Sequence, residues 1–458
     1  MNRGPAITSG RWLIVCAVSA CLALPLAAAE ISVSSARELE AAARAAAPGD
    51  HLILREGTYT DQEFRFFSAG TADRPITLRA QTPGKVVLSG SSTLRIGGSH
   101  LIVDGLVFQG IALASGHILR IGSDDEDKTS HVRITNCAFI NNNPPDAATR
   151  YMWLSAYGTH HRIHHNYFAG QNHLGVTLVV WPKVDRSSHI LIDRNHFAGR
   201  PAGSGNGFET IRLGTSQVQS ASARITVEHN LFEETDGEIE IISNKTCDNI
   251  IRNNTFRNAG GTITLRHGRR AVVEANYFDG QGKASSGGIR VIGPGHIIRR
   301  NFFHNLGNNG QAVIALITAQ SDFDPAGKNN NGYEAVHDVL IEGNTLVTAT
   351  GPLLRLDGLY KNRALQDVRP RNVTITGNTF YNPAAPIFDG VEGEGFVWSA
   401  NTAIGPSIGT IHPRGMEHVA HGQPAPMPED LKPLSASDVG PSWRKQAAKQ
   451  LPPVPTAP

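Results

Sequence analysis

Carboxylates, an amide and two cationic side chains gather in the middle of the chain and could act together chemically. Glu238 and Glu240 are two residues apart, so on an extended strand both point to one face, about 7 Å apart, while Ile239 and Ile241 are expected to point into the core. Two carboxylates this close repel each other unless a cation lies between them. Calcium fits, because it is hard, prefers oxygen ligands and accepts an amide carbonyl, for which Asn206 is a candidate. Glu209 is a weaker candidate for a fourth ligand, because on a strand it would point to the same side as the apolar Ile211.

Two cations accompany these carboxylates. Lys245 and Arg266 are 21 residues apart, close to the 22 and 24 residues that separate repeated asparagines in this region. In a repeat protein this spacing places them on adjacent coils, roughly 5 Å apart along the axis. Such a pair beside carboxylates suggests that the site binds and transforms an anionic substrate. Spacing alone leaves two simpler interpretations open, a solvated acidic stripe and ordinary salt bridges among these side chains.

The chain that carries these groups repeats a six-residue pattern of an aliphatic residue, two variable positions, asparagine, one variable position and phenylalanine. The asparagines of the clear copies are Asn166, Asn195, Asn230, Asn254, Asn276, Asn301, Asn344 and Asn378. Degenerate copies extend the repeat over residues 103–403, and in one of them Cys137 replaces the asparagine. Repeats of 22 to 43 residues with short alternating segments and regular turns are typical of a β-solenoid.

The repeat predicts an all-β fold, a right-handed parallel β-helix in which each coil stacks on the next. At one bend of each coil the asparagine is expected to adopt the left-handed backbone conformation and to bond its amide to the neighbouring coil. The phenylalanine two residues later is expected to stack inside the coils. These residues therefore build the scaffold and are not catalytic.

Segments outside the repeat also have predictable roles. Residues 35–38 match a capping box and predict a short amphipathic helix that covers the first coil. Residues 322–335, rich in Asn and Gly, predict a long loop on the binding face. Residues 406–458 are rich in proline and are not expected to continue a sheet. We expect a C-terminal tail there, packed along the domain or partly disordered, with a short helix over 442–450.

The first 29 residues have the features of a secretory signal peptide. Arg3 and Arg11 precede an apolar run over 12–26, and three alanines up to Ala29 provide a cleavage site. The run is short for a membrane anchor. We expect export to the periplasm or the medium, with lipid anchoring at Cys21 as a minority alternative. The predicted organisation is a signal peptide at 1–29, a β-helix catalytic domain at 30–405 and a tail at 406–458.

Charge and cysteine content narrow the function classes. The chain has 42 Lys and Arg against 40 Asp and Glu, and removing the two arginines of the signal peptide leaves 40 against 40. No broad basic field for nucleic acid is therefore expected. Cys137 and Cys247 are the cysteines of the mature chain, too few for a disulfide framework and without metal-ligand spacing. We expect both to be small buried residues.

Several stretches around these candidate residues closely resemble polysaccharide lyase family 6, the alginate lyases and the chondroitin B (dermatan sulfate) lyases. The resemblance is carried by Asn206–Gly214, DGEIEIISNKT at 236–246, Asn254–Phe256, TLRHG at 264–268 and GGIRV at 287–291. The likeness extends from Ser35 to about Asn401. It implies that Asn206, Glu238 and Glu240 bind calcium, that Lys245 is the general base and Arg266 the general acid, and that His267 and Arg290 bind substrate.

This family resemblance implies an enzyme that cleaves 4-O-linked uronate polymers, with alginate as the expected substrate, by calcium-assisted β-elimination to 4,5-unsaturated oligosaccharides, and the signal peptide implies that it is secreted. The proton on C-5 is removable only when the adjacent carboxylate is neutralised, which calcium can do. A guanidinium hardly gives up a proton, so Arg266 could instead orient a water or stabilise the developing alkoxide.

Three other functions fit these residues less well than alginate cleavage does. A dermatan sulfate lyase would gain from a cationic excess, which the balanced charge does not provide. A non-catalytic polysaccharide-binding β-helix would not need Lys245 and Arg266 together. A glycoside hydrolase would use paired carboxylates flanking a bond and would leave Lys245 without a role. Oligomeric state and the preference among mannuronate, guluronate and mixed blocks do not follow from the sequence.

Overall fold

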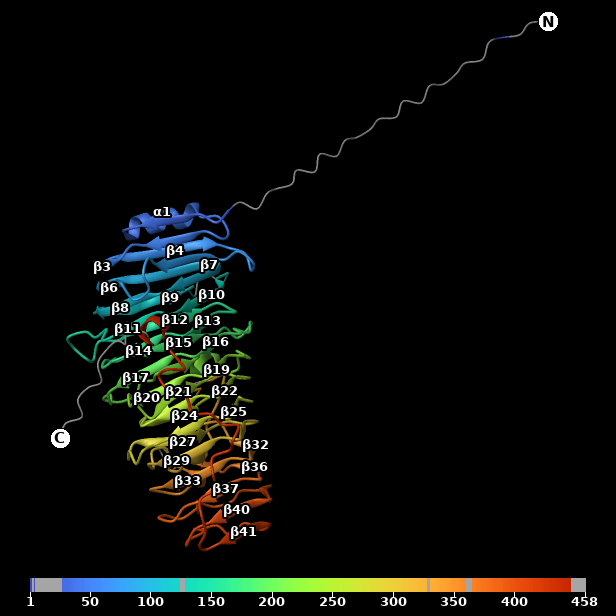
Figure 1. The fold of residues 1–458 in the computed structure, drawn as a ribbon. Coiled ribbons are helices and arrows are strands. Elements are labelled where there is room, and N and C mark those ends of the chain that lie inside the picture. The colour runs from blue at the N-terminus through green and yellow to red at the C-terminus, as the bar shows by residue number, and fades with distance from the viewer. Residues whose placement is uncertain (2–3, 5–26, 124–127, 328–329, 360–364, 446–458) are drawn as a thin grey trace, which may run out of the picture.

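The computed structural model describes residues 1, 4, 27–123, 128–327, 330–359 and 365–445. In these residues the chain winds into a parallel β-helix, a tall stack of coils with α1 (Ala36–Ala45) over its first coil (Figure 1). The predicted fold class, a right-handed parallel β-helix with an N-terminal capping helix, is confirmed. The predicted signal peptide lies almost wholly outside the described residues. Among the described helices, none is long and apolar enough to cross a membrane.

Each coil contributes up to three short strands, which pair in parallel with the next coil and build three ladders, named here A, B and C. Ladders A and B share the long strand β7 (Thr93–Asp104) and together form a 25-stranded sheet, whereas ladder C is a 14-stranded sheet.

The strands of each ladder follow one another at coil intervals. Besides β7, ladder A consists of β4 (Glu63–Ala69), β9 (Gly116–Ile121), β12 (Tyr151–Tyr157), β15 (Leu178–Trp181), β18 (Ile211–Leu213), β21 (Glu240–Asn244), β24 (Gly261–Leu265), β27 (Ser286–Val291), β30 (Ile314–Ile317), β34 (Leu354–Gly358) and β38 (Phe388–Asp389). Ladder B consists of β1 (Glu30–Val33), β2 (His51–Leu54), β5 (Ile76–Ala80), β7, β10 (Ser130–Thr135), β13 (Arg162–His164), β16 (Leu191–Asp193), β19 (Thr226–Glu228), β22 (Ile250–Arg252), β25 (Val272–Glu274), β28 (Ile297–Arg299), β32 (His337–Glu342), β36 (Arg371–Thr376) and β39 (Val397–Ser399). Ladder C consists of β3 (Gly57–Thr60), β6 (Val86–Gly90), β8 (Leu106–Ile111), β11 (Ala138–Ile140), β14 (Tyr167–Ala169), β17 (His196–Arg200), β20 (Leu231–Thr235), β23 (Thr255–Arg257), β26 (Tyr277–Asp279), β29 (Phe302–Leu306), β33 (Thr345–Ala349), β37 (Thr379–Tyr381), β40 (Asn401–Ile404) and β41 (Met416–Val419).

The repeated asparagines form a hydrogen-bonded column at the bend between ladders B and C, as predicted. Asn254 is representative, because its Oδ1 accepts hydrogen bonds from the backbone N and the Nδ2 of Asn230, each at 3.0 Å. Its own Nδ2 donates to the carbonyl of Val227 at 2.9 Å and to Oδ1 of Asn276 at 3.0 Å. Asn254 is 1% exposed, so these bonds form away from water. The column therefore fixes the register of each coil against the next.

The backbone conformation at this bend differs from the prediction. The left-handed residue is the one before the asparagine, such as Asn253 at φ 54° or Ala275 at φ 53°. The asparagine itself must keep a conformation that directs its amide along the axis into the next coil, and the preceding residue makes the turn. The expectation that asparagine adopts the left-handed conformation was therefore wrong.

The repeated phenylalanines stack in one column inside the coils, as predicted. Ring centroids of successive coils are 4.4–5.0 Å apart. The column runs through Phe108, Phe139, Phe168, Phe197, Phe232, Phe256, Phe278 and Phe303. Cys137 occupies an asparagine position, is fully buried and donates its backbone N–H to Asn166, while Cys247 is also free and buried. Both cysteines are thus structural, as expected.

The N-terminal cap follows from the capping box. Ser35 Oγ accepts the backbone N–H of Glu38 at 3.2 Å, and the Glu38 carboxylate accepts the N–H of Ser34 at 2.8 Å. Leu39 and Ala43 face the first coil and are buried. The helix therefore closes the end of the core that stacking would otherwise leave open.

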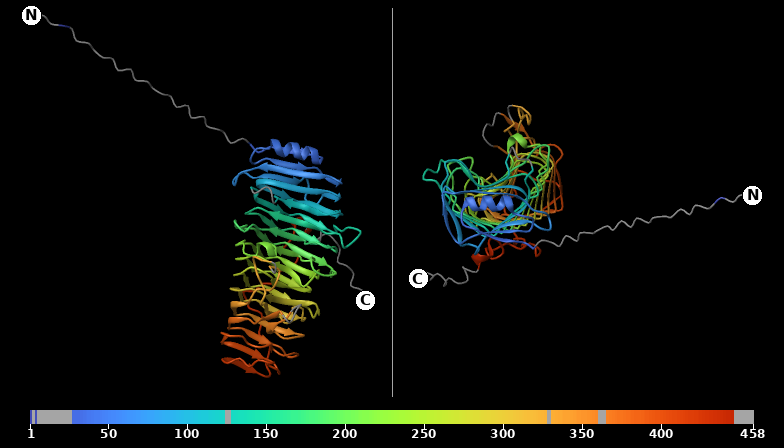
Figure 2. Two further views of the ribbon diagram at one scale, coloured as in Figure 1. Left: turned by 180° about the vertical axis from the view of Figure 1, so that it is seen from behind. Right: turned by 90° about the horizontal axis from the view of Figure 1, so that it is seen from above.

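The C-terminal tail differs from its prediction in one respect. β41 pairs in parallel with β40 and continues ladder C by one strand, because residues 416–419 contain no proline. The tail then returns along the stack, where Leu431 packs against Phe302 and Trp443 donates its indole N–H to the carbonyl of Asn136 at 2.8 Å. Figure 2 shows the tail, in red, on the opposite side of the coils from the inserted segment at residues 320–327 and 330–335. Of the predicted helix over 442–450, residues 442–445 are helical and 446–450 lie outside the described residues.

The asparagine column should contribute strongly to stability. Replacing Asn254 with Ala removes the acceptor of the Asn230 N–H and the donor to Val227, and each buried group left unpaired costs about 1–3 kcal/mol. We expect Asn254→Ala to lower the free energy of unfolding by about 2–5 kcal/mol in urea denaturation. The exposed Asn172 is the control, for which the change to Ala should stay within about 0.5 kcal/mol. Equal effects of the two changes would contradict a stabilising column.

Candidate active site

A cleft of about 430 Å³ opens on the outer face of ladder A, midway along the stack. Its lining includes Gly203, Asn206, Gly237, Glu238, Ile239, Glu240, Lys245, Arg266, Arg290, Asn331 and Tyr333. Six of the seven predicted site residues are in that set. The structure therefore brings together in space the residues that the sequence motifs singled out.

Three carboxylates converge at the cleft. Oxygens of Glu209, Glu238 and Glu240 all lie within 4.8 Å of one another. Oε2 of Glu209 and Oε1 of Glu238 are buried and have no hydrogen-bond partner among the described residues. Burial, together with the charges of Glu209 and Glu240, raises the pKa of Glu238 to about 9. Buried carboxylate oxygens with unused lone pairs fit a cation that takes oxygen ligands.

Glu209 belongs to this cluster more firmly than the sequence suggested. It lies in the loop before β18, so the strand parity that made it a weak candidate does not apply. It is 1% exposed. Its Oε1 is 3.9 Å from both Nζ of Lys245 and Nη1 of Arg212.

A bulge brings Glu238 and Glu240 to the same site. Glu238 precedes β21, and the pairing of β21 with β24 shifts register between Glu240 and Ile242. Ile241 and Ile242 are consequently both buried in the core, whereas Ile239 lines the cleft. The expectation that Ile239 points into the core was wrong, because the segment is not a regular strand.

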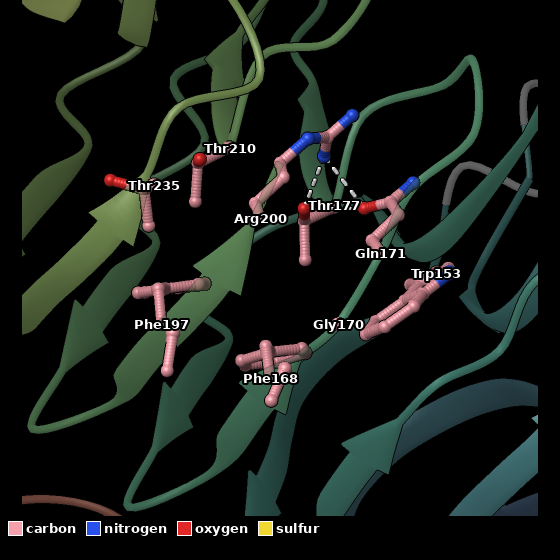
Figure 3. A pocket seen from close by; sticks show the side chains of 11 residues that line it. Trp153, Phe168, Gly170, Gln171, Thr177, Phe197, Arg200, Thr210 and Thr235 are labelled. Atoms are coloured by element: carbon pink, nitrogen blue, oxygen red, sulfur yellow. Dashed lines mark hydrogen bonds between the residues drawn. The ribbon is translucent and has the colours of Figure 1, made fainter. Parts of the chain in front are cut away.

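A buried arginine supports the loop that carries Glu209. Arg200 at the end of β17 donates to Thr177 Oγ1 at 2.6 Å, to Gln171 Oε1 at 2.7 Å and to the carbonyl of Glu209 at 3.2 Å. Figure 3 shows its guanidinium directed toward Thr177 and Gln171. Burial lowers the pKa of Arg200 to about 10, although the charges of Glu209 and Glu238 oppose that shift. Arg200 thus ties the Glu209 backbone to neighbouring coils.

Lys245 and Arg266 lie on adjacent coils, as their spacing predicted. Asn244 pairs with Leu265 in the register of β21 and β24, so the residues that follow them are neighbours along the axis. Arg290 on β27 lies one coil further, and its Nη1 is 3.7 Å from Oε1 of Glu240. Burial alone would raise the pKa of Glu240, but Lys245, Arg290 and Arg266 together with a hydrogen bond from Ser243 lower it. The cations therefore keep Glu240 charged.

Asn331 and Tyr333 of the predicted loop over 322–335 line the cleft, so this described part of the loop lies on the side that the sequence predicted. Arg266 holds this part of the loop, because it donates to the carbonyls of Asn331 at 2.7 Å and Gly332 at 3.0 Å. Its guanidinium carbon also lies 4.5 Å from the centre of the Tyr333 ring. Burial lowers the pKa of Arg266. Tyr333 and Arg212 were not singled out from the sequence, because neither belongs to a paired pattern of charges.

His267 is the predicted site residue that the cleft lining does not include. It is fully buried, and burial together with the charges of Arg266 and Lys245 lowers its pKa to about 2. It is therefore a neutral imidazole with no exposed surface for a substrate. Its assignment to substrate binding stays a prediction.

Known proteins resemble this chain over most of its length. The sequence model of the chondroitinase B family matches residues 33–418. A search among curated proteins found no relative. Among solved structures, the PL6 family alginate lyase AlyGC is 33% identical, with a TM-score of 0.84 over 91% of this chain and 59% of that one. This chain thus spans 59% of the length of that lyase.

Two further solved structures match over nearly the full length of both chains. A mannuronic acid specific polysaccharide family 6 lyase from human gut microbiota is 27% identical, with a TM-score of 0.77, and 92% of this chain and 98% of that one are covered. The PL6 lyase Pedsa3628 from Pseudopedobacter saltans is 26% identical, with a TM-score of 0.76, and the coverage is 90% and 99%. On the match of the family model and of these structures, the chain belongs to the chondroitinase B family, polysaccharide lyase family 6.

Proposed function

We propose that this protein is a polysaccharide lyase that cleaves 4-O-linked uronate polymers, with alginate as the main substrate, by β-elimination. The observation that carries the proposal is the cleft in which Lys245 and Arg266, on adjacent coils, adjoin three converging carboxylates. A solved relative described as an alginate lyase supports the choice of substrate, and another is described as a mannuronic acid specific polysaccharide family 6 lyase. The products would be oligosaccharides with a 4,5-unsaturated end.

The carboxylate cluster fits a calcium ion. Glu238 and Glu240 would hold it with Asn206, as the family resemblance implies, and Glu209 is close enough to share it. The unpaired buried oxygens of Glu209 and Glu238 support this choice, because calcium takes six to eight oxygen ligands. When bound, calcium would neutralise the uronate carboxylate and so make the C-5 proton more acidic.

Lys245 is the base in this proposal. In its neutral form, Nζ accepts the proton from C-5, the electron pair of that bond forms the C4–C5 double bond, and the bond from C-4 to O-4 breaks. The place of Lys245 in the cleft, with Nζ 3.9 Å from Glu209 Oε1, supports a role beside the bound carboxylate. The negative charge that leaves with O-4 then needs stabilisation and a proton.

Arg266 and Arg290 supply that stabilisation. Arg266 donates two N–H groups to the inserted loop and keeps its positive charge in a buried position, so it suits the stabilisation of an alkoxide better than proton donation. Lys245, which has gained the C-5 proton, can then protonate O-4, and a water molecule could do the same. Arg290, 2% exposed and lining the same cleft, would bind a uronate carboxylate.

A dermatan sulfate lyase is the second candidate, because the matching family model is that of chondroitinase B. A non-catalytic polysaccharide-binding protein is the third, and the buried cations beside the carboxylates argue against it. We also propose that residues 1–29 direct export to the periplasm or the medium, which cell fractionation with and without this segment would test.

Loss of the base should abolish cleavage. Lys245→Ala should lower kcat on alginate in calcium by at least about 100-fold, the scale of a general base, as measured by ultraviolet absorbance of the new double bond. Lys85→Ala, an exposed lysine at a turn of the N-terminal coils, is the control and should keep full activity. Activity retained in Lys245→Ala would remove Lys245 from the mechanism. Cleavage of dermatan sulfate instead of alginate by the unchanged protein would favour the second candidate.

Calcium binding should release a proton. Because the pKa of Glu238 is raised from 4.5 to about 9, the metal-free protein holds this proton at neutral pH, and the metal requires the carboxylate. Affinity should therefore rise about tenfold per pH unit below pH 9, with close to one proton released per ion. Calorimetry at pH 7 in two buffers of different ionisation enthalpy measures this release.

The raised pKa of Glu238 should also make the free energy of unfolding depend on pH. Since the folded state holds the Glu238 proton more tightly than the unfolded state, the metal-free protein should lose stability as pH rises between about 4.5 and 9. Glu238→Gln is the matched variant, which should bind calcium more weakly and release no proton. Proton release that is unchanged in Glu238→Gln would assign the titration to another group.

A further inference from the structure

Toward the C-terminal coils, the strand positions that carry the cationic side chains of the cleft become covered. Ile292 follows Arg266 at the same position one coil further, because the residues before them pair in the register of β24 and β27. Ala315 on β30 likewise pairs with Arg290. Arg266 and Arg290 line the cleft, whereas Ile292 and Ala315 are fully buried. Both positions therefore change from cationic side chains in the cleft to covered apolar ones.

Tyr333 is the residue that the inserted loop places over this part of ladder A. Its ring belongs to an apolar cluster separate from the main core, which consists of Ile292, Ala312, Ala315, Ile317 and Tyr333. Ile314 and Leu316 alternate with Ala315 along β30 and point into the main core, so the cluster lies on the outer face of the strand. Tyr333 also lines the cleft. Its ring therefore stands across the outer face of ladder A, at the end of the cleft.

The ring of Tyr333 is held from two sides. The backbone N–H of Tyr333 donates to Oε1 of Gln320 at 3.1 Å, and its carbonyl accepts the N–H of Gln320 at 3.0 Å. Gln320 belongs to β31 (Ala319–Gln320), which pairs antiparallel with β35 (Gln366–Val368). On the side of the cleft, the guanidinium carbon of Arg266 lies 4.5 Å from the ring centre. These contacts fix the place of the ring relative to Arg266.

The covered positions leave little room beyond Arg266. Ile292 lies one coil and Ala315 two coils beyond it, which corresponds to about 5–10 Å along the axis, enough for about one or two sugar rings. The opposite end of the cleft is built differently. In the coil before Lys245, its lining includes Gly203 and Gly205, which have no side chain that could block the path of a chain. The two ends of the cleft therefore differ in how far a bound polysaccharide can extend.

We propose that Tyr333 is the end wall of the substrate cleft and limits how many sugar residues bind on the C-terminal side of the cleaved bond. A polysaccharide chain does not continue past the ring, so it binds with one of its ends against Tyr333. Each cleavage then releases a fragment of about one or two sugars, the length that fits between Arg266 and the wall. The enzyme thus shortens chains from one end. This inference rests on the proposed lyase function for its substrate and for the place of the cleaved bond.

The test is the size of the first products from polymeric alginate, measured by size-exclusion chromatography and mass spectrometry, together with the viscosity of the solution. The unchanged protein should release fragments of about one or two sugars, and the viscosity should fall slowly for each bond broken. Tyr333→Ala removes the wall, so its first products should be longer and the viscosity should fall faster per bond. Tyr333→Phe keeps the ring and should keep the short products. Long first products from the unchanged protein, or short ones from Tyr333→Ala, would overturn the proposal.

A control separates the wall from a general effect of losing a tyrosine. Tyr381→Ala removes a partly buried tyrosine on β37 of ladder C, which does not line the cleft, and should leave the product size unchanged. Because a change at Tyr333 can also lower kcat through its contact with Arg266, product sizes are compared at equal numbers of broken bonds. A lower rate with unchanged product size would mean that Tyr333 only supports Arg266, which contradicts an end wall.

Binding without cleavage separates the wall from the lyase function itself. In calorimetry with Lys245→Ala, short and long alginate chains should each bind a single protein molecule, because only a chain end fits against the wall. With Lys245→Ala, Tyr333→Ala, the number of protein molecules bound per chain should increase with chain length. This pattern supports the wall even if the unchanged protein forms no unsaturated products, a result that overturns the function alone. Several protein molecules on one long chain while Tyr333 is present would overturn the wall.

Discussion

A buried amide must satisfy its donors and its acceptor inside the protein, and the asparagine column meets this requirement only in one register. Asn254 reaches the coil before it through Asn230 and Val227 and the coil after it through Asn276. A slip of one residue would leave several buried polar groups unpaired, at a cost of about 1–3 kcal/mol each. Ladder A has the same register between coils, because the coils that carry the asparagine column also contribute its strands. The side chains of the cleft are therefore held one coil apart by bonds made on a different edge of the molecule.

Charge is the second constraint on the structure, because the carboxylates at the cleft are close together and repel one another. Three carboxylates within 4.8 Å of one another would not all stay ionised without cations. Lys245, Arg266 and Arg290 lower the pKa of Glu240, while Glu238 keeps a raised pKa. Arg200 makes its described hydrogen bonds to uncharged acceptors, one of which is the carbonyl of Glu209. It therefore adds a positive charge beside the backbone of Glu209. The scaffold thus holds an unfavourable group of charges in the arrangement that suits a divalent cation.

The sequence revealed features that recur or form short motifs, and it concealed those that depend on irregular backbone. The asparagine and phenylalanine columns were predictable because each recurs at one place in the coil. Lys245 and Arg266 were predictable because their spacing matches the repeat. The place of Glu209 in the carboxylate cluster and that of Ile239 in the cleft could not be predicted, because both residues precede the strands and periodicity does not describe a loop or a bulge.

The contacts of Arg266 link the chemistry of the cleft to the inserted loop. Its two bonds to the carbonyls of Asn331 and Gly332 use N–H groups that a general acid would need to offer to the substrate. Its ring contact with Tyr333 fixes the plane of the guanidinium. An arginine held on these sides can present only its remaining N–H groups to the cleft, in one orientation. Such a group is preorganised to stabilise negative charge at one point, so a change in the loop would alter that stabilisation without touching Lys245.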